Sequence, residues 1–212
     1  MPSLENIAEA LHRDLETRTA ARDRALAQAR HLIRACAQAI RAAHREDRAQ
    51  ANAHLATARE LAAGLRADLA AFPELYYAGY TQDALKEFAE ASIVDALLNH
   101  HDLPSADDLG IPAAAYVRGM AEAVGELRRR VLDLLRHGYS PEAERLLGLM
   151  DEIYATLVTM DYPDAVTYGL RRLTDIARSL LERTRGDVTL ALRQDVLEQA
   201  LRRAEQRFSA EG

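Results

Sequence analysis

Apolar residues recur every three or four positions along almost the whole chain, and strand-like alternation is absent. This spacing is typical of amphipathic helices, whose buried face repeats with a period of 3.6 residues. Only 10 glycines and 6 prolines interrupt the 212 residues, so the helices are long and their connections short. The pattern predicts an all-α protein: a single-domain bundle of about six to seven long helices over residues 1–212.

Capping residues and prolines define the ends of these helices. Ser3 precedes the first apolar stripe and is a suitable N-cap. Phe72-Pro73 and Tyr162-Pro163 end helices, because a residue before proline is pushed out of the α region. Arg185-Gly186-Asp187 is expected to separate a last helix, which extends the domain. The predicted helices span 3–44, 47–71, 74–99, 112–137, 141–160, 164–184 and 187–208, with a capped helical turn inside the linker 103–112.

Charge and composition exclude several classes of protein. The formal net charge of −6 argues against a protein that coats duplex nucleic acid non-specifically, although it allows a local basic patch. No apolar run approaches the roughly 18 residues that cross a bilayer, and no secretory signal is seen, so we expect no membrane association and a cytoplasmic location. The single cysteine, Cys36, lies within an apolar helical pattern and is expected to be buried.

Two pairs of carboxylates are the candidate chemistry of the chain. Glu87 and Glu90 are three residues apart in the predicted helix 74–99, and Glu122 and Glu126 are four apart in the helix 112–137. One interpretation is solvated charge, with Glu122 and Glu126 paired to arginines on their own helix for a few tenths of a kcal/mol each. The other is that the pairs converge, in which case like charges at short range require a cation. Oxygen ligands without imidazole or thiolate favour Mg²⁺ or Mn²⁺.

Two motifs resemble those of the translin superfamily, and of proteins like translin-associated factor X (TRAX) in particular. Leu85-Lys-Glu87-Phe-Ala-Glu90-Ala91 resembles the TRAX stretch Leu-Gln-Glu-Tyr-Val-Glu-Ala. Tyr116-Val-Arg-Gly119-Met-Ala-Glu122-Ala-Val-Gly-Glu126-Leu-Arg-Arg129 resembles Tyr-Leu-x-Gly-Val-x-Asp-Leu-x-Gly-Glu-Leu-x-Arg, which translin shares. The first motif discriminates better, because translin has no acids at the positions of Glu87 and Glu90. The resemblance covers roughly residues 22–181.

The resemblance implies a translin-like fold and a metal-dependent endoribonuclease that acts on single-stranded RNA. It implies that Glu87, Glu90 and Glu122 are catalytic residues and ligands of Mg²⁺ or Mn²⁺, with Glu126 as a fourth. Glu122 stands where the family has aspartate. The glutamate keeps the negative charge and is longer by one methylene group. It also implies a closed, barrel-shaped homo-oligomer, a hexamer or octamer, with RNA inside.

The chain also departs from the family pattern. The basic stretch that follows the paired tyrosines of translin is missing after Tyr76-Tyr77. RNA contacts must then come from elsewhere, and Arg22 and Arg30 on the first helix are the candidates. Two alternatives remain open at this point: a non-catalytic, translin-like protein that binds single-stranded RNA or DNA, and a purely structural helical oligomer.

Overall fold

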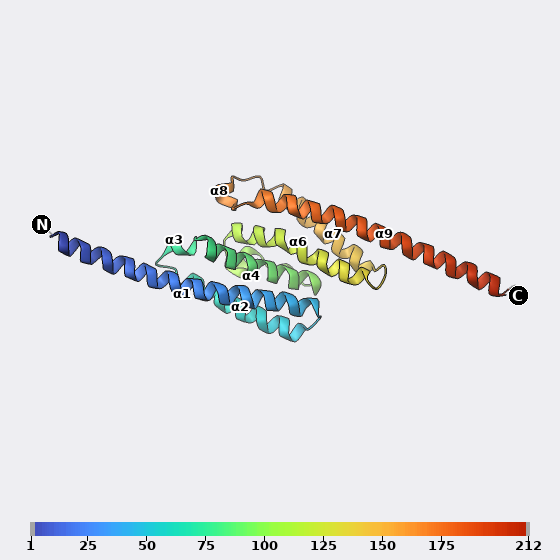
Figure 1. Cartoon of the computed structure of the whole chain (residues 1–212), viewed down its shortest axis with the longest axis horizontal. Helices are drawn as coiled ribbons and strands as arrows, with labels where there is room; N and C mark the ends of the chain where they lie inside the picture. The colour runs from blue at the N-terminus through green and yellow to red at the C-terminus, as the bar shows by residue number, and fades with distance from the viewer. Residues whose placement is uncertain (1–2, 211–212) are drawn as a thin grey trace. The chain divides into compact units, whose positions relative to one another are not determined.

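The computed structural model describes residues 3–210, and within this range all regular secondary structure is helical, as predicted (Figure 1). Six long helices and three single-turn helices make up this part of the chain. They are α1 (Leu4–His44), α2 (Arg48–Asp68), α3 (Pro73–Tyr76), α4 (Gly79–Leu98), α5 (Ala106–Leu109), α6 (Ala113–Leu135), α7 (Pro141–Val158), α8 (Asp164–Thr167) and α9 (Leu170–Ala210). None of these helices is long and apolar enough to cross a membrane.

The chain divides into two compact units, Met1–Gly119 and Met120–Gly212. The boundary falls inside α6, which runs through it without interruption. In the first unit, α1 packs along both α2 and α4 (Figure 1). Alanines dominate the buried face of α1, and small side chains let helix backbones approach closely. Larger buried side chains fill the remaining space: Leu32 of α1, Leu65 of α2, and Leu85, Phe88 and Ile93 of α4.

The predicted capping residues are confirmed at several helix ends. The Ser3 hydroxyl accepts from the Asn6 N–H, as expected. At the start of α2, the Asp47 carboxylate accepts from the Gln50 N–H, a cap that was not predicted. Ser105 and Asp108 form the expected capping box of α5. These contacts lie within three residues of each other in the chain, which is why the sequence reveals them.

One predicted helix, 74–99, is wrong as a single element. The chain leaves the helical conformation at Ala78, which separates α3 from α4. Two buried side chains of α4 donate to carbonyls at the end of α3: the Thr81 hydroxyl to the Leu75 carbonyl and the Gln82 amide to the Tyr76 carbonyl. Apolar periodicity continues across this break, so the pattern gives no sign of it.

The predicted break at 185–187 is also wrong, because α9 continues through Gly186. Arg128 of α6 explains the continuity, since it donates to the Thr184 hydroxyl at 2.8 Å and pairs with Asp187 at 2.9 Å. These contacts lie on either side of Gly186 and offset the roughly 1 kcal/mol cost of glycine within a helix. The chain breaks instead at Tyr168 and Gly169, both at positive φ.

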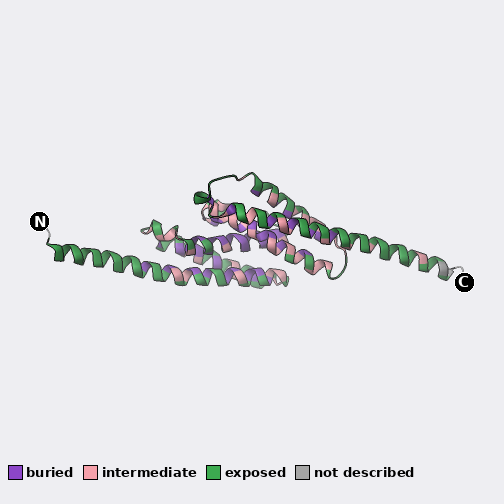
Figure 2. Cartoon of the chain, turned by 45° about the horizontal axis from the view of Figure 1, so that its top comes forward, coloured by how far each residue is buried: buried purple, intermediate pink, exposed green. Residues whose placement is uncertain are grey.

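Both terminal helices are exposed along much of their length (Figure 2), and apolar side chains lie on this exposed surface. In α1, Leu4, Leu11 and Leu15 are 59% to 85% exposed, although the sequence pattern groups them as a helical stripe. The last turns of α9 expose a similar set: Leu190, Val196, Leu197 and Leu201. Elsewhere in the second unit, α7 packs on α9 through buried residues such as Leu146, Met150, Ala177 and Leu181.

Candidate functional site

Helix α4 carries two of the four candidate carboxylates in a largely buried setting. Glu90 is only 8% exposed, and the side chain of Glu87 is 28% exposed. Leu85, Phe88 and Ala89 on the other side of the helix are almost fully buried. Burying an ionised carboxylate is costly unless it is paired or bound to a cation. The position of Glu90 therefore does not fit a freely solvated charge.

Close packing at Gly119 brings the start of α6 against α4. A Cβ atom at Gly119 would lie 2.6 Å from the Cβ of Ala89 and 2.6 Å from the backbone carbonyl of Lys86. It would also lie 2.8 Å from the Glu90 nitrogen. These separations are below van der Waals contact, so only glycine allows the two backbones to come this close. Glu122 follows Gly119 by three residues on the same uninterrupted helix, so it lies on the same side, about one turn later.

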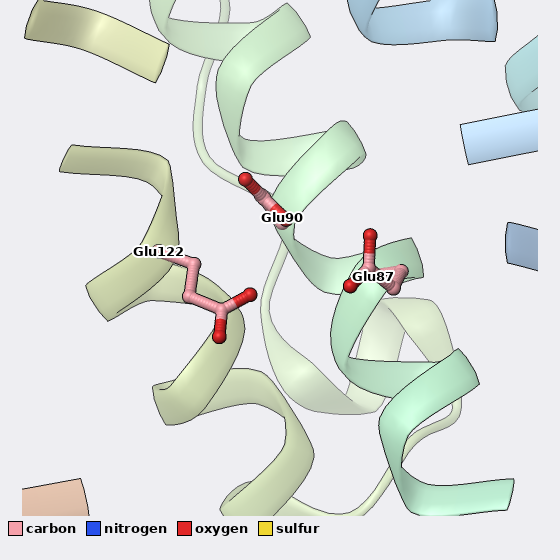
Figure 3. Close-up of side chains that lie close together, drawn as sticks. All are labelled: Glu87, Glu90 and Glu122. Atoms are coloured by element: carbon pink, nitrogen blue, oxygen red, sulfur yellow. The ribbon is translucent and has the colours of Figure 1, made fainter. Parts of the chain in front are cut away.

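Three carboxylates converge as a result. One oxygen from each of Glu87, Glu90 and Glu122 lies within 4.8 Å of the other two. Figure 3 shows Glu122 extending from α6 toward α4, where Glu87 and Glu90 lie one turn apart. We refer to these three side chains as the carboxylate cluster.

The cluster meets the geometric requirements of a divalent cation. Three atoms no more than 4.8 Å apart all lie within about 2.8 Å of one common point, and Mg²⁺ and Ca²⁺ bind oxygen at about 2.0–2.6 Å. Small rotations of the glutamate side chains are enough to bring the three oxygens from this distance to that of metal ligands. All three potential metal ligands are carboxylate oxygens, the ligand type that Mg²⁺ and Mn²⁺ prefer. The residues present thus fit such an ion.

Two cationic side chains accompany the cluster. The Lys86 ammonium lies 3.0 Å from a Glu87 carboxylate oxygen, and the lysine side chain is only 11% exposed. Arg118 of α6 donates to Asp83 of α4 at 2.8 Å, one turn before Glu87. The Arg118 side chain is 14% exposed, so this ion pair is shielded on the arginine side and holds the two helices together.

The remaining predicted site residues lie apart from the cluster. Among the residues described, Glu126 is not part of the group of three, and its carboxylate lies 3.6 Å from Arg129 on the same helix. Arg22 and Arg30 are both exposed on α1, and Arg22 pairs with the neighbouring Asp23 at 3.1 Å. Roles for these three residues in metal or RNA binding stay predictions.

Three residues that shape the cluster were not predicted from the sequence: Lys86, Gly119 and Arg118. Two of them, Lys86 and Gly119, left a signal in the sequence. Lys86 is the single lysine of the chain and directly precedes Glu87. Gly119 lies inside a long helix, where glycine costs about 1 kcal/mol relative to alanine, so a packing reason was to be expected. Arg118 was considered only as a partner of Glu122, four residues away, whereas the structure pairs it with Asp83.

Cys36 of α1 is fully buried, as predicted. Burial raises the pKa of its thiol far above the usual value, and the negative charges of Glu87 and Glu90 raise it further. A raised pKa keeps the thiol neutral at pH 8, and only the thiolate is a nucleophile. We expect a thiol-specific reagent to label Cys36 in the folded protein about 100-fold more slowly, or slower still, than in denaturant. Equally rapid labelling in both states would contradict the buried position.

Comparisons with known proteins agree with the fold and with the family resemblance. No family model matches the sequence. The uncharacterised protein MJ0175 of Methanocaldococcus jannaschii is 32% identical over 199 residues, which are 93% of this chain and 88% of that protein.

Solved structures with this fold include AfC3PO in complex with duplex RNA, with a TM-score of 0.84 and 32% identity over 89% of this chain and 98% of the other. AfC3PO crystallised alone matches with a TM-score of 0.82 and 31% identity, again over 89% and 98% of the two chains. Apo-NeC3PO shares the fold with a TM-score of 0.78 at 20% identity, over 90% of this chain and 98% of the other. The extent and identity of these matches show that the chain belongs to the translin superfamily, the family of the C3PO proteins.

Proposed function

We propose that the protein is a metal-dependent endoribonuclease of the TRAX type, which hydrolyses phosphodiester bonds in single-stranded RNA. The observation that carries this proposal is the convergence of Glu87, Glu90 and Glu122 within 4.8 Å. A protein that only binds nucleic acid gains nothing from three clustered carboxylates, because they repel the phosphate backbone. A protein that hydrolyses RNA with a metal ion needs such a cluster.

The proposed cofactor is Mg²⁺ or Mn²⁺, held by Glu87, Glu90 and Glu122. When bound, such an ion supplies Lewis-acid chemistry for phosphodiester hydrolysis. The chain itself supplies the rigid frame: Glu90 is fixed by its burial, and Glu122 by the close packing at Gly119. Glu126 lies one turn beyond Glu122 and is proposed to orient the site from outside the cluster.

Support for an RNA substrate comes from the structural neighbours. AfC3PO, 32% identical to this chain, has been crystallised with duplex RNA. We propose that this chain also binds RNA, and single-stranded DNA as well, since most backbone contacts do not distinguish the two. The exposed face of α1 offers arginines for phosphate contacts, with Arg22 and Arg30 as the named candidates.

The exposed apolar side chains of the terminal helices support a homo-oligomer. Leu4, Leu11 and Leu15 in α1, and Leu190, Leu197 and Leu201 in α9, are all more than half exposed. Apolar stripes of this length are costly to leave in water and usually mark interaction surfaces. We propose that copies of the chain cover them in a closed hexamer or octamer.

Removal of the metal tests the proposed activity directly. We expect the protein to cleave single-stranded RNA at internal positions with Mn²⁺ or Mg²⁺, and to lose this activity when EDTA is added. Excess Mn²⁺ should restore cleavage, because carboxylate ligands bind the ion reversibly. Cleavage is followed on a labelled oligonucleotide, with a duplex of the same sequence as the second substrate. Cleavage that persists in EDTA would contradict the proposal.

The second candidate function is a non-catalytic RNA-binding protein. The duplex RNA bound to AfC3PO favours it, because binding alone accounts for that complex. It predicts retention of RNA that weakens steeply as salt increases, without cleavage in any divalent cation. Gel-shift and cleavage measurements on the same sample separate the two functions.

A further inference from the structure

Lys86 is the one lysine in the chain, and it lies against the carboxylate cluster. Its ammonium is 3.0 Å from a Glu87 oxygen, and 89% of its side chain is shielded from water. A flexible, strongly hydrated side chain loses both entropy and hydration when it is held in such a place. The attraction of the clustered carboxylates is the interaction that offsets this cost.

Lys86 is in direct contact with one of the proposed metal ligands. The three carboxylates lie within 4.8 Å of one another, and the Lys86 ammonium lies 3.0 Å from a Glu87 oxygen. The nearby Asp83 and Arg118 pair with each other at 2.8 Å. A divalent cation held by the cluster would therefore share the Glu87 carboxylate with this ammonium.

We propose that Lys86 is the resident counter-ion of the carboxylate cluster and competes with the divalent cation for Glu87. It is a positioning residue, which acts through Glu87 rather than on the substrate. Without a metal ion, its ammonium offsets the repulsion among the three carboxylates and keeps them together. With a metal ion bound, the same charge repels the cation and lowers its affinity. This inference rests on the proposed metal site, but it concerns ion binding and makes no use of RNA cleavage.

Isothermal titration of Mn²⁺ into the metal-free protein tests the competition. We expect Lys86→Gln to bind Mn²⁺ about tenfold more tightly than the wild type, because it removes a positive charge a few ångströms from the ion. Lys86→Arg keeps the charge and should stay close to the wild type. Arg178→Gln is the matched control: it removes one positive charge from an exposed ion pair with Glu182 on α9, and should leave the affinity unchanged.

Thermal unfolding provides the second measurement. In EDTA, Lys86→Gln should unfold several degrees below the wild type, and saturating Mn²⁺ should close most of this gap. If this variant does not fold in EDTA, folding on addition of Mn²⁺ supports the proposal, and failure to fold with Mn²⁺ overturns it.

Several results would overturn the proposal that Lys86 competes with the cation. Two concern affinity: Lys86→Gln binds Mn²⁺ no more tightly than the wild type, or Arg178→Gln gains as much Mn²⁺ affinity as Lys86→Gln. The others are a difference in unfolding temperature that Mn²⁺ does not reduce, and no Mn²⁺ binding by either the wild type or Lys86→Gln. A wild type that binds Mn²⁺ with the expected Lys86 effect, but cleaves no RNA, would instead contradict the proposed nuclease and leave this inference standing.

Discussion

Replacement of Glu90 by glutamine is expected to reduce Mn²⁺-dependent cleavage of single-stranded RNA by about 100-fold or more. Glutamine has nearly the same shape, so the packing of this 8% exposed side chain is retained while its charge is lost. An amide oxygen is a weaker ligand for a divalent cation than a carboxylate. A buried position also leaves little room for water to take its place. Cleavage rates at saturating Mn²⁺, together with Mn²⁺ affinity by calorimetry, measure the effect.

The control for Glu90→Gln is the same substitution at Glu60, an exposed residue of α2 in the same unit. Glu60→Gln should cleave RNA and bind Mn²⁺ like the wild type. A contaminating ribonuclease would be equally active in both preparations. Equal cleavage by wild type and Glu90→Gln, with no loss of Mn²⁺ affinity, would remove Glu90 from the proposed site.

Gly119→Ala is expected to destabilise the protein by about 1–3 kcal/mol and to abolish Mn²⁺ binding by the carboxylate cluster. The added methyl group would lie 2.6 Å from the Lys86 carbonyl and from the Ala89 Cβ, so α6 must move away from α4. Alanine gains up to about 1 kcal/mol of helix propensity, but a backbone carbonyl cannot rotate away as a side chain does. Movement of α6 carries Glu122 away from Glu87 and Glu90. Urea unfolding and Mn²⁺ titration report the two effects separately.

Two further variants separate steric overlap from helix propensity. A Cβ at Gly64 in α2 would meet nothing within 4 Å, so Gly64→Ala should stabilise the protein by about 0.5–1 kcal/mol. Ala89→Gly in the Gly119→Ala background removes one of the three close contacts and leaves those with the Lys86 carbonyl and the Glu90 nitrogen, so rescue should be partial. A Gly119→Ala protein that is as stable as Gly64→Ala and binds Mn²⁺ normally would show that the close approach is dispensable.

Much of the fold could be predicted because its determinants are local. Ser3, Asp47 and the Ser105–Asp108 pair cap helices through contacts three residues away, and the 3.6-residue period shows which face is buried. The errors arose where a distant residue decides the outcome. Gly186 lies within a continuous helix because Arg128 binds residues on both sides of it. The break at Ala78 is stabilised by Thr81 and Gln82, whose side chains bond to carbonyls six residues back.

The sequence alone predicts that the protein is helical, where most helices begin, and that Glu87, Glu90, Glu122 and Glu126 are the candidate carboxylates. Spacing alone could not distinguish solvated charges from a cluster, because Glu90 and Glu122 are 32 residues apart and helical periodicity says nothing about which helices are neighbours. The contacts between helices in the folded protein distinguish the two. Packing at Gly119 brings α6 against α4, which places the three carboxylates within 4.8 Å and holds Lys86 against Glu87 away from water.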